Sequence, residues 1–477
     1  MKLTSRILVL LISFLGLVYP VVRFVMRDSS YQNWQQWFFE SQTLYTVRLT
    51  LGLTLISLML SALIAIPMAL WLDQTRTLFA RWVRKFLEVF WVFPSFVYVF
   101  LVLAVLKLFR VEDIFSLRSV VFAWVLAGVP FIVVTLLTGL RDLDVREREA
   151  IQSLGANFWD MLRYFFLPKL KRVIASSFLH QSWLYLTSFS LVVLLSGGPP
   201  RETLEVGIYT ATRLGHVNYA HALALSLWQI LFVLIIRVGL KLLMRSEVKK
   251  EIEQVGIEWF SGSSQSYSKK ILIGVGGLAL SVLFLLPAEL RDALITGVTL
   301  SGWVSCGVIS YALLVYLTGW RGLAEAGAWI SPMVLSLAWW SAYGFDYSPI
   351  LLCFGIQVVL LAPWASRILY PLLDRSRKLE QEALQSIGAH PLRSWLWVEW
   401  PRLKQNVFWL AGVIFGLSLA EVSTVILFSR GGFEPLSVWI QNQLMRFQLD
   451  QAFYGTLLLM AVSMGAILWV RRDHEAR

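Results

Sequence analysis

The chain has few charged residues, and this scarcity sets its class. Of its 477 residues only 15% are Asp, Glu, Lys or Arg, whereas 57% are hydrophobic. Soluble domains carry roughly 25% charged residues. A soluble fold of this composition would leave large apolar surfaces in water. The composition therefore excludes a soluble protein and indicates a membrane protein with several spans.

Cysteine and histidine are also scarce. Cys306 and Cys353 lie in apolar runs, and the five His residues show no spacing typical of metal ligands. We interpret both cysteines as buried thiols and expect no disulfide, metal site or cofactor. The sequence also lacks a Gly-x4-Gly-Lys-Ser/Thr phosphate-binding loop. We therefore do not expect the chain to bind ATP in that way or to be an enzyme.

Apolar segments long enough to cross a bilayer recur along the whole chain. A spanning helix needs about 20 such residues. We predict twelve spans, near 6–26, 46–72, 86–108, 119–139, 173–196, 218–240, 271–288, 293–318, 327–343, 350–370, 407–427 and 451–470. The first is expected to be an uncleaved span. The predicted fold class is an all-α membrane protein with about twelve transmembrane helices.

The positive net charge of +12 is unevenly distributed. Lys and Arg gather in alternate loops, most densely in 141–172 and 375–404. Because basic loops stay on the cytoplasmic side, both termini and both of these loops are predicted to be cytoplasmic. The basic charge thus indicates topology and not nucleic-acid binding.

One short motif occurs twice, 233 positions apart, once in each basic loop. The copies are Glu149-Ala150-Ile151-x3-Gly155-x9-Phe165-x-Leu167-Pro168 and Glu382-Ala383-Leu384-x3-Gly388-x9-Val398-x-Trp400-Pro401. The sequence therefore predicts a tandem duplication, with a first half at 1–245, a linker at 246–270 and a second half at 271–477. Both copies have the same orientation, which favours two parallel six-helix repeats.

The spacing inside the motif predicts two short helices joined by a turn. From Ile151 to Phe165, apolar residues follow steps of three and four and mark one helical face. Gly155 and Gly388 would permit the turn. Pro168 and Pro401 suit the first turn of the helix that re-enters the bilayer.

This repeated motif resembles the ATPase-coupling loop of ABC importer permeases, Glu-Ala-Ala-x3-Gly-x9-Ile-x-Leu-Pro. The third position differs, being Ile151 and Leu384, and Trp400 replaces leucine. The resemblance implies a type I importer-like fold in a bacterial inner membrane. It also implies two copies of a cytoplasmic ABC ATPase and a periplasmic substrate-binding protein as partners. The implied coupling residues are Glu149, Ala150, Gly155, Pro168, Glu382, Ala383, Gly388 and Pro401.

The segment 195–209, Leu-Ser-Gly-Gly-Pro-Pro-Arg-Glu-Thr-Leu-Glu-Val-Gly-Ile-Tyr, is similar to the one after the fifth span of bacterial thiamine permeases. This similarity implies thiamine as the substrate. Importers of ferric iron or polyamines, and a secondary transporter of another class, stay open as alternatives. A secondary transporter would need no ATPase, and the paired motif speaks against it.

Three polar residues in predicted spans are candidates for the substrate pathway. Glu421 is an intramembrane carboxylate, and such groups usually face a cavity or a partner. Ser188 is its counterpart at the 233-residue offset, and Ser423 lies two residues beyond it. Our hypothesis is that these residues line the pathway and that Glu421 attracts a cation such as thiamine.

Overall fold

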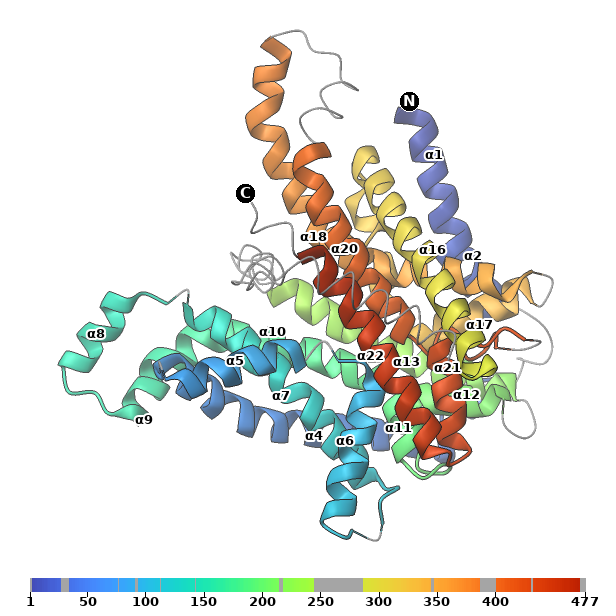
Figure 1. The fold of residues 1–477 in the computed structure, drawn as a ribbon, viewed down its shortest axis with the longest axis horizontal. Helices are drawn as coiled ribbons and strands as arrows, with labels where there is room; N and C mark the ends of the chain where they lie inside the picture. Colours follow the sequence, from blue (N-terminus) through green and yellow to red (C-terminus); the bar gives the residue numbers. More distant parts are fainter. Residues whose placement is uncertain are drawn as a thin grey trace. The chain divides into compact units, whose positions relative to one another are not determined.

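The protein, seen here as a computed structural model, consists of helices and connecting loops, with no strand in the parts described below (Figure 1). The structure describes residues 2–26, 34–75, 77–90, 93–111, 113–141, 143–213, 218–243, 286–344, 347–386, 400–429 and 432–471. They belong to two compact units. One is Asn33–Phe260, and the other joins Met1–Gln32 to Ser261–Arg477.

The unit Asn33–Phe260 is built around a long helix, α4, which packs against α7 and α10. A stripe of buried hydroxyl residues at steps of three and four runs along α4 from Thr43 to Ser61. Small side chains let helices approach closely in membranes. In this stripe, Thr50 accepts a hydrogen bond from the Leu204 N–H at 3.0 Å, and the Ser61 hydroxyl lies 2.9 Å from the Tyr185 hydroxyl. The helices are α3 (Trp34–Phe38), α4 (Ser41–Gln74), α5 (Leu78–Phe90), α6 (Ser95–Leu108), α7 (Leu117–Arg141), α8 (Val145–Ser153), α9 (Phe158–Asp160), η3 (Met161–Phe166), α10 (Leu167–Leu186), α11 (Ser190–Leu195), α12 (Leu204–Arg213) and α13 (Tyr219–Leu243).

The other unit contains the C-terminal helices and also the N-terminal one. The Ser13 and Tyr311 hydroxyls are hydrogen-bonded at 2.8 Å, and the Trp339 indole N–H donates to the Gly16 carbonyl at 2.7 Å. These bonds fix the N-terminal helix to α16 and α17. The helices are α1 (Lys2–Ser13), η1 (Phe14–Val18), α2 (Tyr19–Met26), α16 (Ala288–Thr318), η4 (Arg321–Leu323), η5 (Ala326–Trp329), α17 (Pro332–Tyr343), α18 (Pro349–Ser386), α20 (Trp400–Ala420), α21 (Leu436–Met445) and α22 (Leu449–Arg471).

The structure groups residues 1–32 with the C-terminal helices, whereas the sequence assigns them to a first half at 1–245. Position along the chain is a poor guide to packing here, because a helix can pack against elements far away in sequence. The predicted linker 246–270 lies outside the described residues, so the three-part division stays a prediction.

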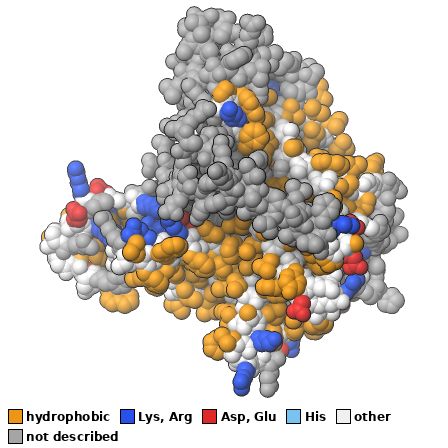
Figure 2. Space-filling view, viewed as in Figure 1, with side chains coloured by type: hydrophobic (Ala, Val, Ile, Leu, Met, Phe, Trp, Pro, Cys, Tyr) orange, Lys and Arg blue, Asp and Glu red, His pale blue; other side chains and the backbone are white. Residues whose placement is uncertain are grey.

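Within the described residues, six helices are long and apolar enough to cross a membrane. They are Arg6–Met26, Ser41–Gln74, Leu117–Arg141, Tyr219–Leu243, Ala288–Thr318 and Pro349–Pro371. Hydrophobic side chains cover much of the described surface on the face shown in Figure 2, as expected where lipid is the solvent. The all-helical membrane fold is confirmed, whereas the twelve spans and their repeat arrangement stay predictions. The predicted span 271–288 falls almost wholly outside the described residues.

Several predicted spans are interrupted. The segment 86–108 is divided between α5 and α6, because Pro94 precedes α6 with extended backbone and proline donates no N–H bond. Helix α10 ends at Leu186, short of the predicted 196, and α20 ends at Ala420, short of 427. The predicted 327–343 helix begins only at Pro332, after a 3-10 turn.

Candidate functional site

The first copy of the motif forms a loop of short helices between α7 and α10. Helix α8 carries Glu149 and Ala150, both exposed, and ends at Ser153. Gly155 follows with φ +82°, in the left-handed region that glycine adopts without a steric penalty. The chain turns there and returns through α9 and η3. Pro168 then lies in the first turn of α10, where its missing N–H is not needed.

A reciprocal cap starts the returning arm. The Asn157 side chain accepts a hydrogen bond from the Asp160 N–H at 2.9 Å. The Asp160 carboxylate accepts one from the Asn157 N–H at 3.2 Å. Two otherwise unsatisfied backbone donors are paired in this way, as in a capping box. The turn between the two arms is therefore defined at both ends, by Gly155 and by this cap.

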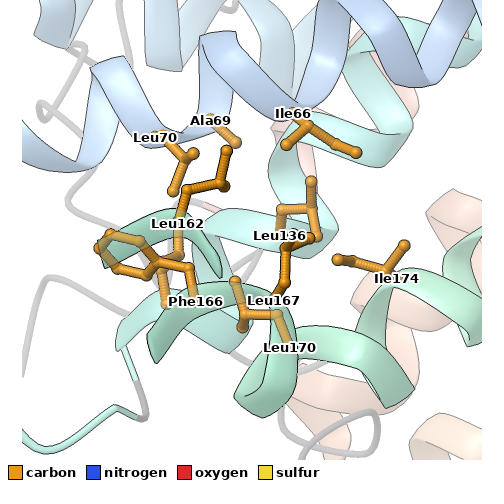
Figure 3. Close-up of a pocket in the computed structure, with 10 residues that line it drawn as sticks. Ile66, Ala69, Leu70, Leu136, Leu162, Phe166, Leu167, Leu170 and Ile174 are labelled. Atoms are coloured by element: carbon orange, nitrogen blue, oxygen red, sulfur yellow. The ribbon is translucent and has the colours of Figure 1, made fainter. Parts of the chain in front are cut away.

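The returning arm is anchored in the core of its unit. Phe165 and Phe166 are buried, and they belong to one apolar cluster with residues of α4 and α7. Figure 3 shows Leu162 and Phe166 of η3 beside Ala69 and Leu70 of α4. Ile66, Leu136, Leu140, Leu167, Leu170 and Ile174 complete the lining of this small apolar pocket. A displacement of the arm must therefore move α4, α7 and α10 as well, because close-packed interiors transmit strain.

Two ion pairs fasten the loop at its base. Arg148 of α8 donates from Nη1 to Oδ2 of Asp73, near the end of α4, at 2.7 Å. Its guanidinium also lies 5.4 Å from the ring centre of Phe166. Glu147 accepts a hydrogen bond from Lys169 in the first turn of α10. Sequence reasoning missed both pairs, because neither partner stands at a spacing that marks a contact.

The tip of the loop exposes apolar side chains. Leu154 is 86% exposed and Trp159 is 72% exposed. The prediction of a single apolar face from Ile151 to Phe165 is therefore wrong. The reason is the turn at Gly155, which sends Leu154 to the surface while Phe165 enters the core. The loop tip therefore exposes apolar side chains, whereas the base of the loop buries them.

The second copy of the motif differs in its helical context. Helix α18 runs without interruption from Pro349 to Ser386 and carries Glu382 and Ala383 in its last turns. Gly388 lies outside the described residues. Pro401 is the second residue of α20, the same place that Pro168 has in α10.

Ser188 lies just beyond the end of α10, where the chain leaves the helix for three residues. Its hydroxyl accepts a hydrogen bond from the Trp124 indole N–H at 3.1 Å. Trp124 stacks on Tyr185 with ring centres 4.9 Å apart. The Tyr185 hydroxyl donates to the Trp124 carbonyl at 2.7 Å and is 2.9 Å from the Ser61 hydroxyl. An aromatic pair thus holds the interruption after α10 against α7 and α4.

A different group occupies the corresponding positions of the other unit. Gln357 and Ser418 stand 233 positions after Trp124 and Tyr185. The Gln357 amide N–H donates to the Thr424 hydroxyl at 3.0 Å, and the Ser418 hydroxyl donates to the Gln357 amide oxygen at 2.5 Å. All three of these polar side chains are buried. A satisfied amide–hydroxyl network therefore holds the interruption after α20.

Glu421 is the first residue beyond α20. It is half-buried, and its carbonyl accepts a hydrogen bond from the Ser437 hydroxyl of α21 at 2.8 Å. Ser423 is buried in the same non-helical stretch. The structure thus brings Glu421 and Ser423 together at one helix interruption and places Ser188 at another, in the other unit.

A carboxylate stands just before α12 and another just before α21. The Thr210 hydroxyl donates to Glu202 at 2.7 Å, and the Asn442 amide donates to Glu434 at 2.5 Å. Both donors stand eight residues after their acceptor. Burial raises the pKa of the Glu202 carboxyl, and the Thr210 hydrogen bond partly offsets this. Glu205 is fully buried, and its carboxylate lies 3.4 Å from the Gln229 amide nitrogen.

Residues 61–204 match the family described as "Binding-protein-dependent transport system inner membrane component". The matched part runs from α4 through the motif loop to the start of α12. This region is therefore an ABC importer permease domain, and the resemblance inferred from the repeated motif is confirmed. Proteins of this family are transport components and not enzymes.

Thiamine and polyamine permeases are among the relatives of the chain. It is 24% identical to the thiamine transport system permease protein ThiP of Haemophilus influenzae over 242 residues, 48% of this chain and 45% of that protein. With ThiP of Brucella abortus the identity is 21% over 393 residues, 75% of this chain and 72% of the relative. The spermidine/putrescine transport system permease protein PotC of Escherichia coli is 32% identical over 122 residues, 25% of this chain and 44% of that protein. The alignment thus spans less than half of the Haemophilus protein.

Proposed function

We propose that the chain is the permease subunit of an ATP-driven importer that passes thiamine across a bacterial inner membrane by alternating access. The observation that carries this proposal is the motif loop between α7 and α10. Its tip exposes the apolar side chain of Leu154, and its base is fixed to three long helices. A partner that moves the tip would therefore move those helices, which is what ATP-driven transport requires.

Two parallel six-helix repeats, each with one such loop, would receive one ATPase subunit each. In this arrangement a periplasmic binding protein delivers the substrate, and both termini lie in the cytoplasm. The residues that would contact the ATPase subunits, or shape the loops that do, are Glu149, Ala150, Gly155, Pro168, Glu382, Ala383, Gly388 and Pro401. The exposure of Glu149 and Ala150 beside Leu154 supports this role for the first loop.

Thiamine is the proposed substrate because the similarity to ThiP extends over three quarters of the chain. Polyamines are the second candidate, since the match to PotC is shorter but more identical. Both ligands are organic cations. Glu421, at the interruption after α20, supports a pathway for either cation, because a carboxylate at membrane depth lowers the cost of passing a cation. Ser423 lies beside it in the proposed pathway, and Ser188 lies at the interruption after α10.

The coupling loop is tested by an ATPase pull-down. Leu154→Asp should lower retention of the ATPase, since it places a charge at the apolar tip of one of the two proposed docking loops. Leu108→Asp is the matched control, because Leu108 is 77% exposed at the end of α6 and outside the loop. Equal ATPase retention by both variants would refute docking of the ATPase through Leu154.

Substrate identity is tested by uptake into proteoliposomes that contain this chain, its ATPase and its binding protein. ATP-dependent accumulation of labelled thiamine is expected, and accumulation of labelled spermidine alone would favour the polyamine candidate. Glu421→Gln should lower cation uptake at least tenfold and leave ATPase retention unchanged. Unchanged uptake would remove Glu421 from the pathway.

A further inference from the structure

Helix α5 (Leu78–Phe90) divides into three sectors along its length. Successive residues of an α-helix turn by about 100°. One sector is buried and contains Ala80, Leu87 and Phe90. Ala80 and Leu87 belong to the same apolar cluster as Phe165 and Phe166 of the motif loop. Helix α5 therefore lies against the unit on the side of that loop.

The neighbouring sector is apolar but faces outward. Trp82 is 72% exposed, and Phe79 is 68% exposed. The ring of Phe79 meets that of Trp71, at the end of α4, with centres 6.3 Å apart. The exposed apolar residues of the sector are Leu78, Phe79, Trp82, Phe86 and Val89. Each of these five side chains is more than 40% exposed.

The third sector is charged and mainly basic. It contains Arg81, Arg84 and Lys85, with Glu88 as its one acid. Arg81 and Lys85 are exposed. Arg84 donates to the Leu72 carbonyl at 2.9 Å and so ties the helix to the end of α4. Arg81 and Lys85 therefore border the exposed apolar sector with positive charge directed away from the protein.

We propose that α5 lies in the plane of the membrane interface and binds anionic phospholipid there. The exposed apolar sector enters the boundary between headgroups and acyl chains, and Arg81 and Lys85 contact lipid phosphates. Exposed aromatic and aliphatic residues bordered by basic side chains are the pattern of helices that lie on a bilayer. Tryptophan and phenylalanine suit this depth, and anionic headgroups complement the charge.

Length supports this position over a transmembrane one. The 13 residues of α5 form a helix about 20 Å long, whereas the hydrocarbon core is about 30 Å thick. Three basic residues in the middle of the helix would be costly at membrane depth. At the interface they stay hydrated. The anchored helix would then give the motif loop a base that is fixed at the membrane surface.

The position of α5 is tested by depth-dependent quenching in the reconstituted full chain. Cys306 and Cys353 are first replaced by Ser and Ala. Single cysteines at Phe79, Trp82 or Phe86 are then labelled with a fluorophore and quenched by nitroxide lipids of known depth. The expected result is one shallow depth shared by all three labels. A label at Met59, 72% exposed midway along α4, is the control and should be deep.

Other outcomes would overturn the proposal. Depths that change steadily from 79 to 86 would make α5 part of a transmembrane span. Absence of lipid quenching, with label shielding that appears only when the ATPase is added, would make this face a protein-docking surface. Either result would overturn the proposal for α5 without affecting the proposed docking role of Leu154, because the Leu154 test measures ATPase retention and not the depth of α5.

The lipid charge is tested with brominated phosphatidylglycerol and brominated phosphatidylcholine as quenchers of the label at Trp82. Phosphatidylglycerol should be preferred by up to about fivefold for each basic side chain, which corresponds to about 1 kcal/mol per residue near the surface. Arg81→Gln with Lys85→Gln should abolish the preference. Lys107→Gln with Arg110→Gln, at exposed positions at the end of α6, should retain it. A preference that survives in the first pair of substitutions would refute anionic-lipid binding by α5.

Discussion

Gly128 has no side chain, and the Tyr185 hydroxyl occupies the space where a Cβ atom would lie. A double-mutant cycle between these two residues tests this packing. A Cβ atom added at Gly128 would overlap the Tyr185 hydroxyl oxygen and would lie 3.0 Å from the Ser61 Oγ. Tyr185 would have to move, and it would lose its bonds to the Trp124 carbonyl and to Ser61. The interruption after α10 would then lose the ring on which Trp124 stacks.

The expected cost of Gly128→Ala follows from these contacts. Two lost hydrogen bonds cost about 1 kcal/mol each. Overpacking in a dense core adds about 1–3 kcal/mol. Alanine regains about 1 kcal/mol of helix propensity inside α7. We therefore expect Gly128→Ala to lower the free energy of unfolding by about 2–4 kcal/mol.

The second substitution of the cycle, Tyr185→Phe, removes the Tyr185 hydroxyl. Tyr185→Phe alone should cost about 1–2 kcal/mol, for the lost hydrogen bonds. In the double variant the nearest ring atom would be Cζ, 3.1 Å from the new methyl group, so most of the overlap disappears. Gly128→Ala with Tyr185→Phe should therefore be more stable than the sum of the single effects by about 2 kcal/mol, within the range of couplings between touching residues.

The assay is SDS-induced unfolding in mixed micelles, followed by tryptophan fluorescence. Gly52→Ala on α4 is the matched control, because no atom lies within 4 Å of the added Cβ. It should be neutral or stabilising by up to about 1 kcal/mol. Two results would show that the Tyr185 hydroxyl does not fill this space. One is that Gly128→Ala is as stable as Gly52→Ala. The other is that the double variant is destabilised by the sum of the two single effects.

Two further predictions concern charged groups. Asp73→Asn or Arg148→Gln should each lower the free energy of unfolding by about 1 kcal/mol and reduce ATP-dependent uptake. The charge exchange Asp73→Arg with Arg148→Asp should restore part of the stability and part of the uptake. If uptake does not recover in the exchanged variant, the ion pair has no role in coupling. Because burial raises the native pKa of Glu202, its folded state binds more protons, and the stability of the protein falls as pH rises above the ordinary value of 4.5. Glu202→Gln should remove this loss of stability at high pH. The difference between the unfolding midpoints of the variant and the unsubstituted chain should therefore rise from pH 4.5 to pH 8. If that difference does not change with pH, the pKa of Glu202 is not raised.

The sequence predicted what depends on local composition. Long apolar runs predicted α4, α7, α13 and α18 within a few residues of their bounds, except that α18 continues beyond the predicted end at 370 to Ser386. The motif spacing predicted a turn at Gly155 and a helix start at Pro168. The turn follows from the left-handed conformation that glycine permits, and the helix start follows from the missing N–H of proline. Both are properties of one residue, so they can be predicted without knowledge of tertiary contacts.

The helix interruptions could not be predicted in the same way. The stretch after Leu186 is Thr-Ser-Phe-Ser, with neither proline nor glycine, and it continues an apolar run. It leaves the helix where Ser188 receives a bond from Trp124, more than 60 positions away. An apolar run predicts membrane depth, but a remote hydrogen bond decides where the helix stops.

The two interruptions occur at equivalent positions but are held by different chemistry. Around α10 a stacked Trp124–Tyr185 pair fills the space, whereas around α20 Gln357 and Ser418 form a hydrogen-bonded network. The duplicated motif therefore predicted where a polar residue would lie and could not predict its surroundings. Because Glu421 stands beside the polar network and Ser188 accepts a hydrogen bond from Trp124, these two of the three candidate pathway residues are not equivalent. A cation would find its carboxylate in one half alone, and we expect Ser188→Ala to affect stability more than uptake, in contrast to Glu421→Gln.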